Sequence, residues 1–578
     1  MKSKRVYPKN LKLIRDSFDI TTKELPEKVG FLEKRPGKKE FREIRYKEFR
    51  QNVTSIGGAL IEKLGLQGER IAIIGENSYE WAVSYYSVVC GTGIVVPLDK
   101  ELPAKEIVNL VKRSRSKAIF FSSRKRDLIN SIREEVPDLK YYIELYSDEN
   151  QLENTFKGEN DYSFDELLEL GKDCDESVLM SVPIDPEEFK ILLFTSGTTA
   201  ESKGVMLTNR NIVSNIEAAI SMFELRNDDR FFSVLPLHHS YESTVGMMIP
   251  IYCGLSIGYA GGLKSIANDL KAVQPSVLLG VPALIENLIK KVNINIEKQG
   301  KTKLVNSMIA ITNAFGKTGY MLKRKVFKSI LDGLGGKIRI IVSAAAPIDP
   351  EVGRRIEGFG IYFIQGYGLT ETSPLATLVP DTDRRLGAVG KPGKCCVVKI
   401  HEPNEEGIGE VWIKGENVTQ GYYENEEETA RSITDGWFHS GDLGYLDKDD
   451  FLYLTGRCKN LIITGNGKNV YPEEIENLVN KIPYVNESLV YAKQDPKDEK
   501  EQIIAVKVTL DEAYLKEKYG KDIPSDEEMY NLIWAEIKEV NKKLSGFKWI
   551  KDLQIKKEDF IKTTTMKIKR YEELKNDK

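Results

Sequence analysis

Hydroxyl residues, a glycine and a lysine follow an apolar run in LLFTSGTTAESKG, which spans residues 192–204. Gly197 lets the backbone turn successive N–H groups toward an anion, and Lys203 adds a positive charge. A Walker A loop needs glycine before its lysine and a hydroxyl residue after it, whereas this chain has Ser202 and Gly204 there. We therefore predict a phosphate-binding loop of another kind. A polar surface turn is the alternative.

A second candidate segment is IQGYGLTETSP, which begins at residue 364 and again ends an apolar run. Tyr367 lies between two glycines, so its flat ring could stack on an adenine that comes close to the backbone. Thr370 and Glu371 offer a hydroxyl and a carboxylate, the hard oxygen ligands that Mg²⁺ prefers. The same pattern also fits a strand-to-helix turn capped by threonine.

A third candidate segment runs from DGWFHSGDLGYLD to LYLTGRCKNLIITGNGKNVYPEEIE. Asp442 lies between two turns that contain glycine, where its carboxylate could accept both hydroxyls of a ribose. Arg457 could donate to the same sugar or to a phosphate. A carboxylate that only stabilises a turn is the alternative for Asp442.

Short apolar runs alternate with helical patterns and predict the frame that positions these segments. RIAIIGEN, GIVVPLD and KAIFFSS have the profile of buried strands, and SVLLGVP, IRIIVSAAAP and IYFIQGYG resume the alternation. An amphipathic helix precedes the first strand, with one apolar face made of Phe49, Val53, Ile56, Leu60 and Leu64. This order predicts a doubly wound parallel α/β sheet, in which ligands bind beyond the carboxyl ends of the strands.

The pattern changes from about residue 394, where CCVVKIHEP and GEVWIKG predict an antiparallel β subdomain. Beyond Arg457, a helix in NVYPEEIENLVNKI, strands in ESLVYAK and QIIAVKVTL, and a long helix after Pro524 predict a smaller α+β unit.

Composition excludes several classes of protein. With 84 Lys+Arg and 87 Asp+Glu the net charge is −3, so the chain has no overall field that would attract nucleic acid. The six cysteines have no disulfide or metal spacing, and the basic N-terminus lacks the apolar core of a secretory signal, so we expect a cytoplasmic protein. The uncharged stretch 243–263 contains Pro250 and several glycines, which favours a buried helix, turn and strand over a transmembrane segment.

The three segments, in this order, closely resemble the signature motifs of the adenylate-forming superfamily, which comprises acyl-CoA synthetases, luciferases and the adenylation domains of peptide synthetases. The resemblance runs from about residue 46 to residue 570. It implies an α/β fold with a large ATP- and acyl-binding domain at 1–456, whose β subdomain covers about 394–456. A hinge at 457–459 and a small, mobile α+β domain at 460–578 complete the expected organisation.

The resemblance implies a role for each matching residue. The β- and γ-phosphates of ATP would be bound by Thr195, Ser196, Gly197, Thr198, Thr199 and Lys203. The adenine and the α-phosphate would be bound by Ala345, Ala346, Gln365, Gly366, Tyr367, Gly368 and Thr370. The ribose would be bound by Asp442 and Arg457, and Mg²⁺ by Thr195 and Glu371. The acyl pocket would be lined by His239, Ala344 and Ala345.

A C-terminal lysine completes the family pattern in IKTTTMKIKR, where Lys567 takes the catalytic position. Its charge would bridge the substrate carboxylate and the α-phosphate. The resemblance implies that Thr195 and Glu371 are the other two catalytic residues. Lys459 falls on the hinge about which the small domain turns, and Gly467 resembles the glycine that lets the thiol of CoA pass. Ile561 and Met566 replace the usual proline and glycine of this motif.

The sequence also departs from the family pattern in the first loop and at residue 463. Ala200 and Ser202 replace glycine and proline in the first loop, which changes its backbone bias but keeps its donors. Ile463 replaces a lysine that many relatives carry, so we expect that one contact to nucleotide or CoA is missing.

The resemblance implies that a carboxylate attacks Mg·ATP to give an acyl-adenylate and pyrophosphate, after which a thiol takes the acyl group. PLHHSYE and GNGKNVYP resemble the fatty-acyl branch, so we expect a medium- or long-chain fatty acid and CoA as substrates. An acyl carrier protein as acceptor and a nucleotide-binding regulator without turnover remain the alternatives. The basic arm before Asp16 could touch anionic lipid, or be a solvated tail.

Overall fold

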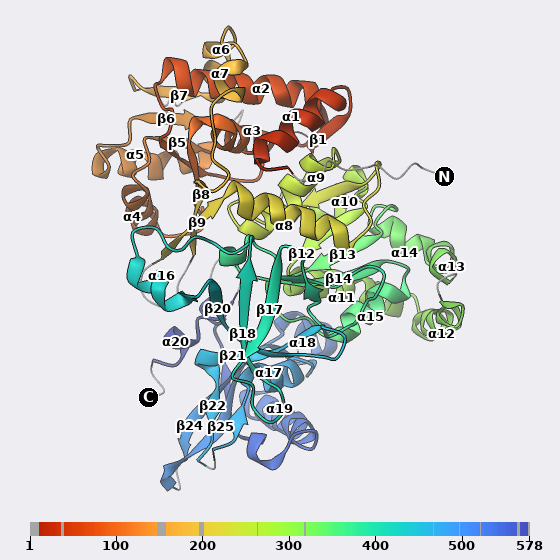
Figure 1. Cartoon of the computed structure of the whole chain (residues 1–578). Helices are drawn as coiled ribbons and strands as arrows, with labels where there is room; N and C mark the ends of the chain where they lie inside the picture. The colour runs from red at the N-terminus through yellow and green to blue at the C-terminus, as the bar shows by residue number, and fades with distance from the viewer. Residues whose placement is uncertain are drawn as a thin grey trace. The chain divides into compact units, whose positions relative to one another are not determined.

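The computed structural model describes residues 11–35, 38, 40–146, 158–195, 202–262, 264–316, 319–465, 467–495, 498–520, 522–562 and 567–575. The chain divides into two compact units (Figure 1). The first comprises Met1–Val398, Ile413–Phe438 and Asp450–Leu452, and the second comprises Lys399–Trp412, His439–Asp449 and Tyr453–Lys578.

A seven-stranded sheet in the first unit carries the predicted phosphate loop. Its strand order is β7-β6-β5-β3-β4-β8-β9, and all neighbours are parallel except β8 and β9. The strands are β3 (Arg70–Ile74), β4 (Ile94–Pro97), β5 (Ala118–Phe121), β6 (Tyr141–Glu144), β7 (Asp161–Ser163), β8 (Phe189–Thr195) and β9 (Lys203–Thr208).

A nine-stranded sheet in the same unit carries the predicted adenine segment. Its order is β16-β15-β14-β13-β12-β10-β11-β1-β2, with parallel pairing from β14 to β1 and antiparallel strands at both edges. The strands are β1 (Val29–Glu33), β2 (Arg42–Arg45), β10 (Arg230–Ser233), β11 (Ser256–Tyr259), β12 (Val277–Gly280), β13 (Ile340–Ser343), β14 (Tyr362–Tyr367), β15 (Thr377–Leu378) and β16 (Lys391–Pro392). The predicted doubly wound α/β class is confirmed.

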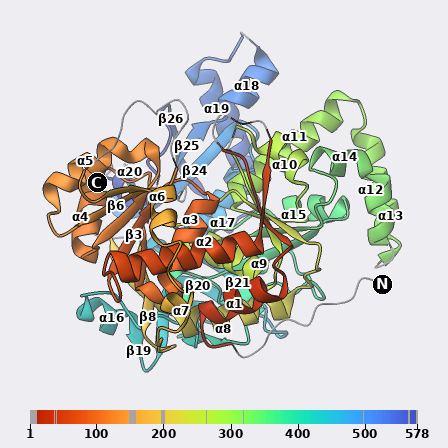
Figure 2. The ribbon, with the colours of Figure 1, turned by 90° about the horizontal axis from the view of Figure 1, so that it is seen from above.

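Three helices lie side by side and contribute aromatic side chains to the hydrophobic core of the first unit (Figure 2). They are α1 (Ile14–Glu24), α2 (Tyr46–Gly58) and α3 (Tyr79–Ser87). The stripe predicted for α2 is buried, and the rings of Phe18 and Phe49 meet edge to face with centroids 5.4 Å apart. Gly65 ends this helical region with a φ of 66°, which favours glycine.

The other helices of the first unit connect the strands and cover the sheets. They are α4 (Ala104–Ser114), α5 (Arg126–Glu135), α6 (Phe164–Leu170), α7 (Ser177–Met180), α8 (Asn209–Met222), α9 (Ile249–Tyr252), α10 (Ile266–Val273), α11 (Pro282–Lys298), α12 (Thr302–Asn313), α13 (Gly319–Val326), α14 (Lys328–Gly333), α15 (Pro350–Gly358) and α16 (Glu426–Ser432). Shorter π- or 3₁₀-helical turns include η1 (Ala59–Lys63), η2 (Val88–Thr92), η5 (Glu242–Met248) and η7 (Thr370–Thr372).

The uncharged stretch 243–263 folds as predicted, into the helical segments η5 and α9, a turn and the buried strand β11. No helix among the described residues is long and apolar enough to cross a membrane. Residues 1–10 of the basic arm lie outside the described residues. Arg15 donates to the carbonyl oxygens of Cys90 and Val182 at 3.1 and 2.7 Å, so this part of the arm is anchored to the protein.

Five strands between residues 396 and 457 form a sheet of order β17-β18-β20-β19, with β21 paired to β20. They are β17 (Cys396–His401), β18 (Gly409–Gly415), β19 (Ile433–Thr434), β20 (Trp437–Leu446) and β21 (Leu452–Arg457). After β21 comes the short turn η8 (Cys458–Asn460) and then the two-stranded ribbon of β22 (Ile462–Ile463) and β23 (Asn469–Val470).

The remaining part of the second unit has the predicted α+β pattern. Its sheet consists of β24 (Val485–Asp495), β25 (Asp498–Leu510) and β26 (Ile550–Lys556), with β24 antiparallel and β26 parallel to β25. The helices are α17 (Pro472–Val479), α18 (Glu512–Tyr519), α19 (Asp526–Asn541) and α20 (Arg570–Glu573). Ile475 on α17 and Ile533 on α19 are fully buried with Val506 on β25 in one core.

Candidate functional site

Thr195 and Lys203 face each other where β8 ends and β9 begins. The Thr195 hydroxyl lies 3.5 Å from the carbonyl oxygen of Lys203. Ser202 is fixed to α4, because its hydroxyl donates to Glu106 at 2.9 Å and its carbonyl oxygen accepts from Arg113 at 2.8 Å. The structure thus positions both ends of the predicted phosphate loop. Ser196, Gly197, Thr198, Thr199 and Ala200 lie outside the described residues.

The ammonium group of Lys203 forms an ion pair with Glu428 on α16 and lies 5.2 Å from the centre of the Tyr422 ring. Both members of the pair are largely shielded from water, which strengthens their attraction. Burial by itself would raise the pKa of Glu428, but the hydrogen bond and charge of Lys203 outweigh it and leave that pKa below its usual value. Lys203 therefore meets an anionic partner in the position predicted for phosphate binding.

Tyr422 connects this lysine to the predicted metal ligand. Its hydroxyl donates to Oε1 of Glu371 at 2.9 Å, and the Glu371 carbonyl oxygen accepts from the backbone of Thr419 at 2.8 Å. Burial, with the charge of Glu371, raises the pKa of Tyr422 well above its usual value, so the hydroxyl stays protonated and remains a donor. A contact chain from Thr195 through Lys203 and Tyr422 thus reaches Glu371.

Sequence reasoning missed Tyr422 and Glu428. Lys203 and Glu428 are 225 residues apart in the chain, and no motif connects them. They meet because Val205 on β9 forms an antiparallel bridge with Tyr422, and Tyr423 donates its backbone N–H to Gly204.

The oxygen donors of Thr195 and Glu371 fit Mg²⁺. A hydroxyl and a carboxylate are hard ligands, and an ionised carboxylate has enough lone pairs to accept a hydrogen bond from Tyr422 while it binds a cation. The chemistry of the two side chains is therefore compatible with the predicted metal role.

The adenine candidates lie at the carboxyl end of β14, which ends at Tyr367. Tyr367 is only 8% exposed. Gly368 has no room for a side chain, because a Cβ there would lie 1.8 Å from the carbonyl oxygen of Pro374, and a Cβ on Gly366 would lie 3.1 Å from Leu378. Gln365 is buried and its Oε1 has no hydrogen-bond partner, which leaves an acceptor for a ligand or for water.

The segment that carries His239 lies against the ends of both β13 and β14. Ser240 donates to the hydroxyl of Thr370 at 3.4 Å, and the Tyr241 hydroxyl donates to the carbonyl oxygen of Val342 at 3.2 Å. These contacts bring the partly buried His239 toward the predicted α-phosphate threonine and toward the alanines that follow β13.

Those alanines differ in exposure and in backbone conformation. Ala344 is half-buried, whereas Ala345 and Ala346 are exposed. Ala345 has a φ of 75°, in the left-handed region that favours glycine. An alanine at this position therefore carries backbone strain that a glycine would not.

In the second unit the structure joins the two predicted ribose ligands. Arg457 Nε lies 2.7 Å from Oδ1 of Asp442, which is 6% exposed. Gly441 turns the backbone with a φ of 69° and donates its N–H to Glu410 at 2.9 Å, which fixes the approach to Asp442. The pair therefore places a carboxylate, which can accept hydrogen bonds from ribose hydroxyls, next to a guanidinium group, which can donate to a phosphate.

Lys567 is exposed, and the chain on either side of it is anchored. Lys562 and Ile568 form an antiparallel bridge, while Arg570 contacts both carboxylate oxygens of Glu476 at 2.5 Å. Burial raises the pKa of Glu476 to about 7, although the charge of Arg570 opposes this. Met566 lies outside the described residues, so the structure does not describe this departure from the motif.

Three further predicted positions lie near the start of the same unit. Lys459 is exposed in η8. Gly467 has a φ of 70° and open space where a side chain would be. Ile463 is 61% exposed, so this apolar side chain occupies a solvent-facing position where a lysine would be expected.

Comparison with known proteins adds three findings. A family model described as "AMP-binding enzyme" matches residues 18–423. The chain is 28% identical to a long-chain-fatty-acid–CoA ligase, FadD15, of Mycobacterium bovis, over 88% of this chain and 86% of that protein. It is 30% identical to long-chain-fatty-acid–CoA ligase 5 of Rattus norvegicus, over 76% of this chain and 67% of that protein.

Solved structures share the fold. The anthranilate CoA ligase AuaEII in complex with anthranoyl-AMP matches with a TM-score of 0.75 and 21% identity, over 99% of this chain and 98% of that one. ATP-bound MatB from Rhodopseudomonas palustris matches with a TM-score of 0.73 and 22% identity, over 97% of this chain and 99% of that one.

Proposed function

This chain belongs to the AMP-binding enzyme family, and we propose that it is an AMP-forming ligase that joins a medium- or long-chain fatty acid to CoA. The observation that carries the proposal is the contact chain from Lys203 through Tyr422 to Glu371. It connects Lys203, a cation that could bind phosphate, to the carboxylate of Glu371, which could bind the metal ion. Activation of a nucleoside triphosphate needs both groups. The named relatives supply the acid class, because they are long-chain-fatty-acid–CoA ligases.

The first half-reaction forms an acyl-adenylate. A carboxylate oxygen attacks the α-phosphorus of ATP, a new P–O bond forms, and the bond to the bridging oxygen breaks so that pyrophosphate leaves. Lys203 and Thr195, with 196–199, hold the leaving phosphates. Tyr367, with Ala345, Ala346, Gln365, Gly366 and Gly368, surrounds the adenine, and Thr370 donates to the α-phosphate.

Thr195 and Glu371 are the residues that would hold Mg²⁺. The ion supplies neutralisation of phosphate charge when it is bound. Tyr422 holds the Glu371 carboxylate in one orientation through its hydrogen bond, so the metal ligand does not have to be ordered when the nucleotide arrives.

Residues of the second unit complete the proposed chemistry. Asp442 and Arg457 bind the ribose, and Lys567 neutralises charge on the carboxylate and the α-phosphate during the first attack. Movement about the hinge at 457–459, which includes Lys459, then replaces Lys567 with the passage beside Gly467. The thiol of CoA then loses its proton to solvent, its sulfur forms a bond to the adenylate carbonyl carbon, and the bond from that carbon to the phosphate oxygen breaks so that AMP leaves.

The acid is proposed to enter beside His239, Ala344 and Ala345. The division into domains at 1–456 and 460–578 is part of the same proposal. A cytoplasmic location is also part of the proposal.

Pyrophosphate release over saturated acids of increasing chain length, with and without CoA, tests the proposal. We expect acid-dependent release that peaks at medium or long chains, and acyl-CoA when CoA is present. Glu371→Gln provides the inactive control. A parallel reaction with an acyl carrier protein separates the alternative acceptor: product on the carrier protein but not on CoA contradicts the proposal. Absence of acid-dependent release across the panel supports a regulator without turnover instead.

A further inference from the structure

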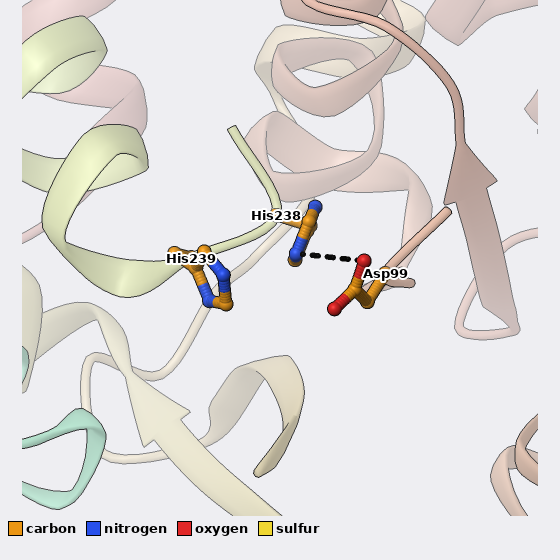
Figure 3. A group of neighbouring side chains, drawn as sticks. All are labelled: Asp99, His238 and His239. Carbon is orange, nitrogen blue, oxygen red and sulfur yellow. Dashed lines mark ion pairs between the residues drawn. The ribbon is translucent and has the colours of Figure 1, made fainter. Parts of the chain in front are cut away.

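Asp99, His238 and His239 form a side-chain cluster in the first unit (Figure 3). Asp99 follows the carboxyl end of β4, and the two histidines lie between β10 and η5. One potential ligand atom from each residue lies within 4.8 Å of the others. Figure 3 shows His238 between the other two side chains, and its dashed line marks the ion pair between a ring nitrogen of His238 and the Asp99 carboxylate.

The separation of His238 and Asp99 suits a shared ion better than a direct hydrogen bond. Nε2 of His238 lies 3.4 Å from Oδ1 of Asp99, whereas N–H···O bonds are about 2.7–3.2 Å long. Nε2 makes no hydrogen bond, although His238 is only 8% exposed. Two ligand atoms that each lie about 2.1 Å from a tetrahedral ion are about 3.4 Å apart. The geometry therefore leaves room for a metal between the two side chains.

The backbone on both sides of the cluster is held in place. Asn77 donates to the carbonyl oxygen of Leu235 at 2.6 Å and accepts the N–H of Leu237 at 3.0 Å, directly before the two histidines. Asp99 Oδ1 accepts the N–H of Glu101 at 2.9 Å. The ligand atoms are therefore positioned by their own loops, so little ordering would be needed on metal binding.

The chemistry of the cluster selects the ion. Imidazole nitrogens suit Zn²⁺ and its neighbours Co²⁺ and Ni²⁺, whereas Mg²⁺ and Ca²⁺ prefer oxygen ligands only. Two neutral imidazoles and one carboxylate give three protein ligands, and a water molecule or a carboxylate can take the fourth tetrahedral position.

We propose that Asp99, His238 and His239 bind one divalent transition-metal ion, with Zn²⁺ as the best match. This site differs in ligand type from the oxygen site of Thr195 and Glu371. The proposal does not depend on the proposed ligase activity, because metal binding can be measured without turnover. If turnover is absent and zinc binds as described below, the proposed function fails while this site stands.

Zinc calorimetry and cobalt absorption on the full-length, chelator-treated protein test the site. We expect one ion per chain, with at least a tenfold loss of affinity in His238→Gln and in Asp99→Asn. His401→Gln is the matched control, because His401 stacks on Trp412 with ring centres 3.7 Å apart and is not part of the cluster. The chain has only four histidines, so this control removes one of the two that lie outside the cluster.

Measurements on the unaltered protein keep the proposal testable if a variant fails to fold. X-ray absorption of the zinc-loaded protein should show nitrogen and oxygen neighbours with imidazole scattering, and zinc should raise the melting temperature. Sulfur neighbours would place the ion on cysteines and overturn the proposal. So would binding only at millimolar zinc, unchanged affinity in the folded His238→Gln or Asp99→Asn protein, or an equal loss in His401→Gln.

Discussion

Tyr422→Phe is the most direct perturbation of the contact chain between Lys203 and Glu371. It removes the hydroxyl that donates to Glu371 at 2.9 Å and keeps the ring beside Lys203. A hydrogen bond to a charged group contributes about 1.5–3 kcal/mol. Because about 1.4 kcal/mol corresponds to a factor of ten in rate, we expect kcat/KM to fall about 10- to 100-fold if this bond holds Glu371 for Mg·ATP.

Tyr422→Ala separates the role of the ring from that of the hydroxyl. It also removes the aromatic face, which lies 5.2 Å from the ammonium group of Lys203. A cation–π contact that is shielded from water, as this one is, contributes about 2 kcal/mol, so we expect a further loss of about 30-fold. We therefore expect kcat/KM to be highest in the wild type, lower in Tyr422→Phe and lowest in Tyr422→Ala.

The assay is the initial rate of pyrophosphate release at saturating acid over a range of ATP concentrations, which gives kcat/KM, repeated at several Mg²⁺ concentrations. A positioning role for Tyr422 predicts that Tyr422→Phe needs more Mg²⁺ for half-maximal activity, which a general loss of folded protein does not. Tyr423→Phe is the control, because its ring also carries a cation, Arg70, at 5.1 Å but has no contact with Glu371 among the described interactions. An unchanged Mg²⁺ dependence in Tyr422→Phe, or an equal shift in Tyr423→Phe, refutes the reasoning.

Three further predictions address other residues. Lys567→Ala should abolish adenylate formation yet spare thioester formation from supplied acyl-adenylate, measured by pyrophosphate release and by acyl-CoA production; equal loss of both contradicts the assignment. Ala345→Gly should stabilise the protein by about 0.5–1 kcal/mol, because it relieves a φ of 75°, whereas Ala344→Gly should destabilise it in the same urea titration. Burial raises the pKa of Glu242 to about 8, so the stability that its neutral form contributes is present at low pH and is lost as pH rises toward 8. Glu242→Gln should therefore raise the melting temperature relative to wild type more at about pH 9 than at about pH 5, and an equal shift at both would argue against a neutral Glu242.

The elements that could be predicted from the sequence are those whose burial follows a simple pattern along the chain. Strands β4, β5, β12 and β13 are buried at every position, so each appears in the sequence as an uninterrupted apolar run. Helix α2 was predictable for the complementary reason, because buried residues such as Phe49 and Val53 recur at helical spacing between exposed ones in its first part. Local composition was enough in both cases.

Contacts between distant segments were not predictable in this way. Tyr422 and Glu428 contact Lys203 through the bridge between Val205 and Tyr422, which depends on the fold and leaves no spacing in the sequence. The strain at Ala345 was also hidden, because alanine itself gives no signal for a positive φ. By contrast, Asp442 and Arg457 were predicted together from their motif, and their 2.7 Å contact brings them together in the structure.

The two proposed metal sites differ in ligand type, and a hydrogen bond between Ser240 and Thr370 connects the segments that carry them. Oxygen ligands at Thr195 and Glu371 suit Mg²⁺, and imidazoles at His238 and His239 favour Zn²⁺, so Mg²⁺ should not displace Zn²⁺ from the histidines. Ser240 directly follows the histidines and donates to Thr370, which itself precedes Glu371. An ion that fixes the histidines therefore restricts the residue that contacts the proposed α-phosphate threonine. Because such coupling is reciprocal, any change that nucleotide causes in zinc affinity must be matched by an equal effect of zinc on nucleotide affinity.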